Sequence, residues 1–411
     1  MAESPAPLVD IDRSIVHLDP RVHPPRVSAV PRSARGDRFE AEVEPTLLIA
    51  DILREASGRR ILILLGAAFR TMNPDTDIEV RCGETGRALA TTYLTRDTLR
   101  APKWLVVDAP DSVTTLDLAI GGQRILRPVQ PNLSHLFAGR RTLFMVSRNE
   151  PLQRIVDWVW WHVDRHRFDG VVYYHNGSRD YDWRDAAEAL TDIPGLRSCV
   201  VVDWTHVAYP FARGKPWGLS EAWSQNGGYW HALQRFLQEA ELVFNGDVDE
   251  LIVSFNGTSL DHLLEDDTWD AILPPAQDVV TEHGVLPPDA RHRDLFLLTA
   301  APDFRHQKWL VRCSGAPPEH FPSMHVPPMY RHHQLEEDQL RLVHFRPLTT
   351  GWHGRQLRRI RTGDNPEFAE DSLNLRRQLE DVFDRWSWPP RAPSATAPPG
   401  MPGTMPDGAR T

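Results

Sequence analysis

The chain has 411 residues, of which 41% are hydrophobic and 25% are charged, and its formal net charge is -10. This length allows two or three domains with a large apolar core, and the composition is that of a globular protein. The acidic balance argues against a general nucleic-acid binder, which normally carries a basic surface. No apolar run approaches the roughly 18 residues of a membrane-spanning helix, so no transmembrane segment is expected.

The N-terminus and the cysteines bear on the cellular compartment. Residues 1–11 have neither a basic start nor a long apolar core, so no secretory signal is expected. The cysteines, Cys82, Cys199 and Cys313, are odd in number and far apart, and their spacing fits neither a disulfide framework nor a zinc site. We therefore predict a reducing, cytoplasmic location.

The two ends of the chain and the segment 41–139 differ in composition from the rest. Residues 1–40 are rich in Pro, Arg and Ser without apolar periodicity, which predicts an irregular arm, and the Pro-rich tail 387–411 is predicted to be disordered. Between them, residues 41–139 hold short apolar runs separated by Gly, Pro and Asp, which predicts a small β-rich accessory domain. The strands expected there are 46–50, 60–65, 77–81, 88–93, 104–107 and 115–120.

Residues 140–386 alternate between strand and helix patterns, which predicts an α/β fold with a mostly parallel sheet and flanking crossover helices. Continuous apolar runs, typical of strands buried on both faces, occupy 142–146, 170–174, 198–204 and 242–244. Apolar residues at helical spacing predict helices over 152–163, 183–190, 223–241 and 368–386. Asn149 is a candidate N-cap of the first helix. The tryptophans of that helix are expected to pack in the core: Trp158, Trp160 and Trp161.

An acidic cluster follows the predicted strand 242–244. Asp247 and Asp249 flank Val248, and Glu250 comes next. In an extended backbone the two aspartates project the same way, while Val248 points into the core. Neighbouring carboxylates repel each other unless a positive group lies between them, and a hard divalent cation suits that role. The alternative interpretation is a solvated acidic turn after a strand.

Polar residues follow several of the predicted parallel strands. Ligands of open α/β sheets bind at the carboxyl ends of the strands. The loops 148–150, 175–180 and 247–250 are therefore expected to gather at one edge of the sheet. Their convergence predicts a functional site there.

Taken in order, these motifs resemble glycosyltransferases of the GT-A fold, and in particular glycosyltransferase family 92 and its bacterial relatives near family 2. The resemblance covers about residues 141–350. It rests on Arg148-Asn149-Glu150, on Asp157-Trp158-Val159 with His162, on Asn176-Gly177-Ser178-Arg179-Asp180, on Gln225-Asn226, on Asp247-Val248-Asp249-Glu250, on Lys308 and on His344. Leu251 departs from the family, which usually has an aromatic residue after the acidic cluster.

The resemblance implies a metal-dependent glycosyltransferase that moves a sugar from a nucleotide-diphosphate donor to a glycan or a small-molecule acceptor. Asp249, with Asp247 directly or through water, would hold Mn²⁺ or Mg²⁺, which would stabilise the diphosphate as leaving group. A late histidine would be a further metal ligand, either His344 or His325; the alternative for His344 is a packed or surface histidine.

Further roles follow from the same resemblance. Asn149, Glu150 and Asp180 would face the nucleoside, and Lys308 would neutralise phosphate; alone, such a lysine is more often a solvated surface charge. The full set expected to contact the donor is Asn149, Glu150, Asn176, Asp180, Asp247 and Lys308. An inverting transferase also needs a carboxylate base, and the sequence does not choose among Glu250, Asp278 and Glu282.

Two other functions stay open from the sequence. A haloacid-dehalogenase-type phosphohydrolase also places Asp-x-Asp after an apolar strand, where the first Asp attacks phosphorus. That family has Thr or Val where this chain has Leu251, and its fold starts with this strand, whereas three strands are predicted before it here. The other alternative is a non-catalytic relative that binds glycans, against which the presence of Asp247, Asp249 and Glu150 argues.

Overall fold

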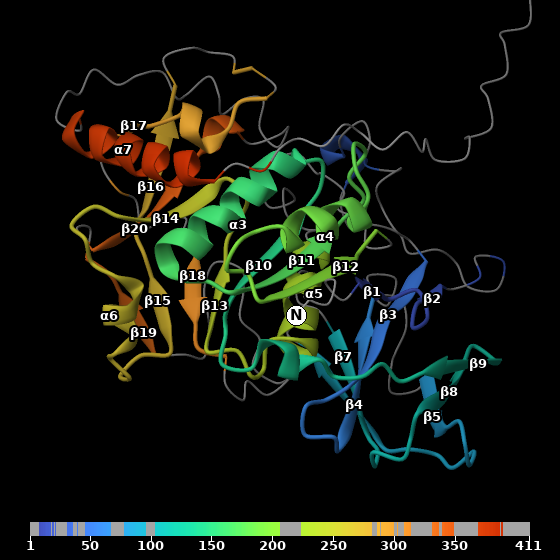
Figure 1. Ribbon diagram of the computed structural model, residues 1–411. Coiled ribbons are helices and arrows are strands. Elements are labelled where there is room, and N and C mark those ends of the chain that lie inside the picture. Colours follow the sequence, from blue (N-terminus) through green and yellow to red (C-terminus); the bar gives the residue numbers. More distant parts are fainter. Residues whose placement is uncertain are drawn as a thin grey trace, which may run out of the picture.

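The protein is an α/β molecule with mixed sheets, and more of its described residues lie in strands than in helices (Figure 1). The structure is a computed structural model that describes residues 8–17, 19, 21, 31–35, 39, 46–66, 78–95, 103–205, 223–281, 286–287, 289–299, 302, 308–313, 331–336, 339–348, 369–386 and 388. The α-helices among these residues are α3 (Leu152–His166), α4 (Trp183–Thr191), α5 (Trp223–Arg235), α6 (Leu260–Leu264) and α7 (Ala369–Arg385).

The central sheet has eight strands. Their spatial order is β1 (Leu8–Asp10), β12 (Ser198–Asp203), β11 (Gly170–His175), β10 (Arg141–Ser147), β13 (Leu242–Asn245), β18 (Trp309–Val311), β15 (Ala271–Leu273) and β19 (His332–Gln334). The strands from β1 to β13 are parallel to their neighbours, and β18 is antiparallel to both β13 and β15. The chain builds outward from β10 through β11 to β12 and then returns to place β13 on the other side of β10. The strand order therefore reverses between β10 and β13, which is where open α/β sheets bind ligands.

Alternating side chains of the central strands enter two different cores. Leu143 and Met145 of β10 pack in the core that contains α3 and α4, while Phe144 packs in the core that contains α5. In β11, Tyr173 packs in the core with α3 and α4, and Tyr174 packs in the core with α5. This period of two, with apolar layers on both faces, explains the continuous apolar runs of these strands and confirms that they are buried on both faces.

A second, four-stranded sheet continues from the central one. Its order is β14 (Glu250–Ser254), β20 (Leu340–His344), β16 (Ala276–Val280) and β17 (Leu297–Leu298). The chain passes from β13 into β14 through residues 246–249, so the predicted acidic cluster lies at the crossing from one sheet to the other. Helix α7 packs against α3 and β17, and Figure 1 shows it in red beside β17.

Helix α3 covers the free edge of β14 with hydrogen bonds. The indole N–H of Trp158 donates to the carbonyl of Glu250 (2.7 Å), and that of Trp161 donates to the carbonyl of Ile252 (2.8 Å). Nε2 of His166 donates to the same Ile252 oxygen (2.8 Å). These side chains satisfy backbone groups that face away from β20, which would otherwise be buried without partners. The expectation that the tryptophans of this helix pack in the core is confirmed.

The β-rich unit consists of two antiparallel sheets. The larger has the order β2 (Val16–His17), β3 (Leu47–Arg54), β4 (Arg60–Leu65), β7 (Lys103–Asp108) and β6 (Thr91–Thr95), and the smaller has the order β5 (Ile78–Cys82), β8 (Thr115–Ile120) and β9 (Gln123–Pro128). All the strand regions predicted between 46 and 120 are present. Strand β9 was not predicted; it forms a hairpin with β8 across Gly121 and Gly122, whose φ angles of 55° and 83° suit glycine.

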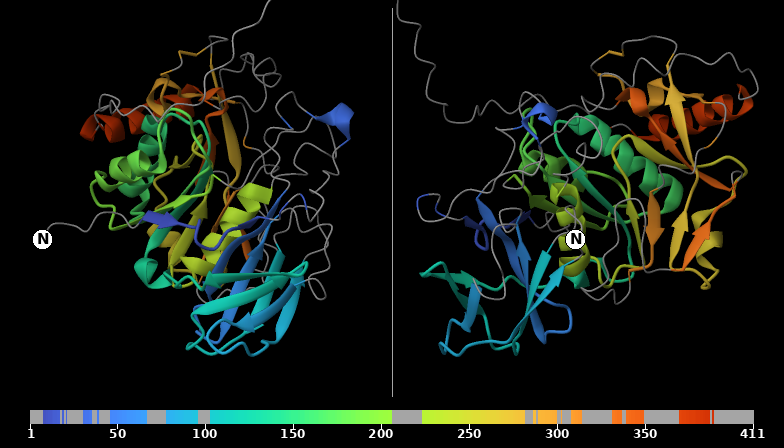
Figure 2. Two further views of the ribbon diagram at one scale, coloured as in Figure 1. Left: turned by 90° about the vertical axis from the view of Figure 1, so that its right-hand side faces the viewer. Right: turned by 180° about the vertical axis from the view of Figure 1, so that it is seen from behind.

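The larger β-sheet shares an apolar core with α5 and the central sheet. Leu62, Leu64 and Trp104 of this sheet pack in the same cluster as Tyr229 and Leu233 of α5. Figure 2 shows the yellow-green helix α5 next to the blue strands of the β-rich unit. The N-terminal segment also joins both parts, because β1 extends the central sheet and β2 extends the larger β-sheet. Residues 8–10 and 16–17 thus differ from the irregular arm that their composition predicts.

A buried ion cluster crosses the boundary between the β-rich unit and α5. Oδ2 of Asp51 in β3 lies 2.7 Å from Nε2 of His231 and 2.7 Å from Nη1 of Arg235. His231 Nδ1 is 2.6 Å from the hydroxyl of Tyr174 in β11. Burial alone would raise the pKa of Asp51, but Arg235 and His231 outweigh it and hold that pKa well below its ordinary value. Asp51 is therefore a buried anion with Arg235 as its countercharge and His231 as a hydrogen-bond partner.

Two predicted helix ends are wrong, and the structure gives the reasons. Pro151, not Asn149, is the N-cap residue of α3. The residue before a proline, here Glu150, disfavours the helical region, so the helix begins only after Pro151. Asn149 has a left-handed backbone, with a φ of 61°. Helix α5 ends at Arg235 rather than near residue 241, because the segment after the β-rich unit takes its last carbonyls: Leu133 N–H donates to Arg235 O (2.8 Å). In the part of the chain that the structure describes, no helix is long and apolar enough to cross a membrane.

Removing the Asp51 carboxylate should destabilise the protein strongly. We expect Asp51→Ala to lower the free energy of unfolding by about 3–5 kcal/mol, because Arg235 would be left as a buried charge without its partner. Glu79→Ala is the control, since Glu79 pairs with Arg81 on the surface of the same unit and such exposed pairs contribute about 0–1 kcal/mol. Urea unfolding of both variants measures the difference, and equal losses would contradict the assigned role of Asp51.

His166, one of the two buried histidines of α3, should contribute to the acid sensitivity of the protein. Burial lowers the pKa of His166 to about 4, whereas the unfolded chain takes up this proton near the ordinary value. His166 therefore contributes stability that is present above about pH 6.5 and is lost as the pH falls toward 4, at up to about 1.4 kcal/mol per pH unit. His166→Gln keeps an N–H donor for Ile252 and does not titrate. Urea unfolding at several pH values should show a smaller acid loss in this variant, and an unchanged slope would contradict the assignment.

Candidate functional site

The acidic cluster forms a tight turn between the two sheets. The N–H of Glu250 donates to the carbonyl of Asp247 (2.9 Å), and the N–H of Asp247 donates to Oε2 of Glu250 (2.9 Å). Val248 is buried, as predicted, and its carbonyl accepts from Nε2 of His292 (2.8 Å). Gly246 is required before this turn, because a Cβ there would lie 2.5 Å from the ring of Phe244. The turn is thus packed through Gly246, Val248 and Glu250, while the side chain of Asp247 is 42% exposed.

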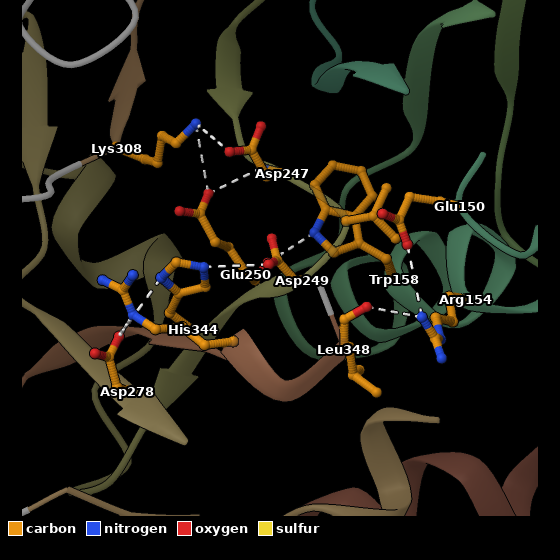
Figure 3. A network of polar contacts seen from close by, with 12 residues as sticks. Glu150, Arg154, Trp158, Asp247, Asp249, Glu250, Asp278, Lys308, His344 and Leu348 are labelled. Atoms are coloured by element: carbon orange, nitrogen blue, oxygen red, sulfur yellow. Dashed lines mark hydrogen bonds and ion pairs between the residues drawn. The ribbon is translucent and has the colours of Figure 1, made fainter. Parts of the chain in front are cut away.

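Asp247 is held by a buried lysine and by a glutamine of α5. Nζ of Lys308 lies 2.8 Å from Oδ2 of Asp247 and 3.7 Å from Oε2 of Glu250 (Figure 3). Nε2 of Gln225 donates to Oδ1 of Asp247 (3.1 Å). Lys308 directly precedes β18, whose Trp309 pairs with Asn245 of β13, and this pairing delivers the lysine to the acidic turn. Lys308 is almost fully buried, so it is a fixed cation of the site.

Mutual interactions shift the pKa values of Glu250 and Lys308. Burial raises the pKa of Glu250 to about 7; Lys308 opposes this shift and Asp247 adds to it. Burial would lower the pKa of Lys308, but Asp247 and Glu250 outweigh it and hold that pKa above its ordinary value. The site therefore contains a permanent cation and a carboxyl group that can exchange a proton near neutral pH.

Asp249 faces a histidine from the second sheet. Nε2 of His344 lies 3.2 Å from Oδ2 of Asp249, and the N–H of Phe345 donates to the carbonyl of Asp249 (2.6 Å). His344 lies opposite Glu250 in the pairing of β20 with β14. Burial would lower the pKa of His344, but Asp249 outweighs it and raises that pKa to about 9. His344 therefore lies beside the acidic turn, in contact with Asp249.

His344 also faces a carboxylate on its other side. Its Nδ1 lies 3.5 Å from Oδ1 of Asp278, a residue of β16, and Figure 3 shows the imidazole between Asp249 and Asp278. Nε of Arg346 is 2.6 Å from the same Asp278 oxygen. Arg346 was not identified from the sequence. No local pattern marked it, because its contact with Asp278 joins the 3-10 turn η6 (Arg346–Leu348) to a strand that is distant along the chain.

Asp249 and His344 could hold a divalent cation. Two adjacent ligands of an octahedral ion at about 2.1 Å lie about 3 Å apart, and Oδ2 of Asp249 and Nε2 of His344 are separated by 3.2 Å. Within the described ranges, three or more His, Cys, Asp or Glu side chains do not converge as a ready-made metal cage. The pair fits an ion whose remaining ligands are water and phosphate oxygens. Asp247, bound to Lys308 and Gln225, would reach such an ion through water.

The residues expected to face the nucleoside lie at the ends of β10 and β11. The N–H of Asn149 donates to Oγ of Ser178 (2.9 Å), which joins the two loops as predicted by their position. Asn176 is buried, and its amide donates to the carbonyl of Trp204 (2.9 Å), so it also ties the end of β11 to the end of β12. Asp180 is exposed in the same loop.

Glu150 is associated with a buried arginine that sequence reasoning missed. Its Oε2 lies 3.7 Å from Nη1 of Arg154, one helical turn later in α3. Arg154 also donates to the carbonyls of Ala290 (2.8 Å) and Leu348 (2.8 Å). It therefore joins three segments beside the site, and only its i,i+4 spacing from Glu150 could have suggested it.

The functional interpretation rests on this geometry. No protein-family model matches the chain, and no curated protein matches it. The structure brings together Asp247, Asp249, Glu250, Lys308 and His344, and it places Asn149, Glu150, Asn176 and Asp180 at the ends of neighbouring strands. Glu282 and His325 lie outside the described residues.

Removing the cation of Lys308 should destabilise the protein in a pH-dependent way. Lys308→Met would raise the pKa of Glu250 further, because Lys308 now opposes that rise. We expect a loss of about 3–5 kcal/mol above pH 8, where Glu250 is ionised, and a smaller loss near pH 5.5, where it is neutral. Lys103→Met, the same substitution on a partly exposed lysine of β7, controls for the change of side chain. Urea unfolding at both pH values measures the losses, and a loss independent of pH would contradict the coupling.

Proposed function

We propose that the protein is a metal-dependent glycosyltransferase that moves a sugar from a nucleotide-diphosphate donor to a glycan or small-molecule acceptor. The observation that carries the proposal is the acidic turn between β13 and β14, where Asp249 pairs with His344 at 3.2 Å and Asp247 pairs with Lys308 at 2.8 Å. This combination offers one site for a hard cation and, beside it, a fixed positive charge. A diphosphate group needs both kinds of partner.

The position of the turn in the sheet supports the proposal. The parallel strands β12, β11, β10 and β13, followed by the antiparallel β18, agree with a GT-A type of sheet. The acidic turn follows β13, and the loop with Asn149 and Glu150 follows β10, so the two lie at the reversal of strand order. A donor bound there would extend from the nucleoside loops to the acidic turn.

Each residue of the turn has a role under this proposal. The ion, held by Asp249 and His344 with Asp247 through water, would neutralise the diphosphate as it leaves. Lys308 would add a second positive charge, and its contacts with Asp247 and Glu250 hold it in place before substrate binds. Gln225 would keep the carboxylate of Asp247 oriented.

A carboxylate base would accept the proton of the acceptor hydroxyl if the reaction inverts configuration. The pKa of Glu250, raised to about 7, suits proton transfer near neutral pH. One of its oxygens is bound by the N–H of Asp247, so Glu250 also shapes the turn. Asp278 of β16 and Glu282, shortly after that strand along the chain, are the other two candidates from the sequence.

The test is thermal melting against a panel of nucleoside diphosphates, each with and without Mn²⁺. We expect one nucleotide to raise the melting temperature only together with Mn²⁺, because a ligand at 100 times its Kd stabilises the native state by about 2.7 kcal/mol. Asp249→Asn should abolish this shift. Asp111→Asn, the same substitution on an exposed carboxylate of the β-rich unit, should retain it.

The same melting measurement, extended to Mg²⁺ with a phosphate mimic and to glycans, separates the transferase from the alternatives. A shift that needs Mg²⁺ and a phosphate mimic, without any response to nucleotides, would overturn the transferase and favour a phosphohydrolase. Binding of glycans without a response to either metal or nucleotide would favour a non-catalytic glycan-binding protein.

A further inference from the structure

We propose that Asp278 is a positioning residue, which holds the ring of His344 so that its Nε2 faces Asp249 and the metal ion. This inference rests on the proposed function, because it concerns the metal site of that transferase. It assigns Asp278 a role distinct from that of the carboxylate base considered from the sequence.

The sheet places three titratable side chains in one row. His344 of β20 lies opposite Glu250 of β14 and opposite Asp278 of β16. Residues that lie directly opposite each other on neighbouring strands project from the same face of a sheet. The row Glu250, His344 and Asp278 therefore lies on the face that borders the acidic turn, and the backbone pairing fixes its order.

The two nitrogens of His344 have different neighbours. Nε2 lies 3.2 Å from Oδ2 of Asp249, and Nδ1 lies 3.5 Å from Oδ1 of Asp278. A histidine that binds a metal usually donates its other ring N–H to a carboxylate or a carbonyl, which fixes the tautomer and the ring orientation. With an ion on Nε2, the remaining ring proton is on Nδ1, and the group that faces it is Asp278.

Asp278 is itself held in place. Nε of Arg346 lies 2.6 Å from its Oδ1, and the N–H of Thr299 in the next chain segment donates to its backbone carbonyl (2.9 Å). Arg346 belongs to the 3-10 turn η6 (Arg346–Leu348), which is separated from β20 by Phe345. The contacts thus form a series from Arg346 through Asp278 and His344 to Asp249.

The experiment measures Mn²⁺ binding by electron paramagnetic resonance, which detects the free hydrated ion, in the full-length protein with Mn²⁺ alone as the probe. We expect Asp278→Ala to weaken Mn²⁺ binding about 10- to 100-fold. This range is typical when the residue that accepts the other ring N–H of a metal-binding histidine is removed. Asp278→Asn keeps an oxygen that can accept from Nδ1 and should lose less. The melting temperature without metal is recorded for every variant.

Asp371→Ala is the matched control. Asp371 pairs with Arg341 of the same strand β20 at 2.6 Å, and its side chain is 29% exposed, compared with 31% for Asp278. The control therefore removes a similar carboxylate–arginine pair without touching His344. A merely structural role of Asp278 would lower the melting temperature as in Asp371→Ala and leave the Kd for Mn²⁺ at the wild-type value.

The outcomes separate this inference from the proposed function. Weakened binding in Asp278→Ala, intermediate binding in Asp278→Asn and wild-type binding in Asp371→Ala support the positioning role. Wild-type binding in all three variants overturns it and leaves the transferase proposal standing. An absence of Mn²⁺ binding in the wild type overturns the metal site itself, and the role of Asp278 with it.

Discussion

Three carboxylates within four residues are the constraint on which this arrangement depends. Asp247, Asp249 and Glu250 share one turn, and Glu250 is buried, so these groups can coexist only beside positive charge. The cations come from distant parts of the chain, since Lys308 precedes β18 and His344 ends β20. Both sheets must therefore meet at this turn, and the chain crosses between them there.

Helix α3 packs against β14, the strand that follows the acidic turn. A helix packed on a sheet usually offers only apolar contact, but α3 also offers indole and imidazole nitrogens to the backbone of β14. They take the place of a neighbouring strand at the carbonyls of Glu250 and Ile252. Because Trp158 binds the carbonyl of Glu250, the position of the helix and the geometry of the acidic turn are directly linked.

The sequence predicted what depends on local pattern and missed what depends on distant pairing. The apolar runs identified the central strands, and the spacing of Asp247 and Asp249 predicted that they flank a buried residue. Lys308 and His344 entered only through a family resemblance, because nothing local shows that they meet the turn. The row from Glu250 to Asp278 depends on the register of β14, β20 and β16, which are separated by long segments. Asn149 was wrongly predicted as the N-cap of α3, because Pro151 shifts the start of the helix to Leu152.

The shared core around α5 has a consequence for how the molecule can be divided. The change of sequence pattern near residue 139 suggests a place to cut, but the apolar cluster that contains Trp104 and Tyr229 spans it, as does the buried contact of Asp51 with Arg235. A fragment beginning after residue 139 would expose one face of α5. It would also leave the guanidinium of Arg235 without the carboxylate of Asp51. Helix α5 also carries Gln225, which contacts Asp247 of the acidic turn. The β-rich unit therefore supports the site through α5, and it forms one folding unit with the rest of the protein.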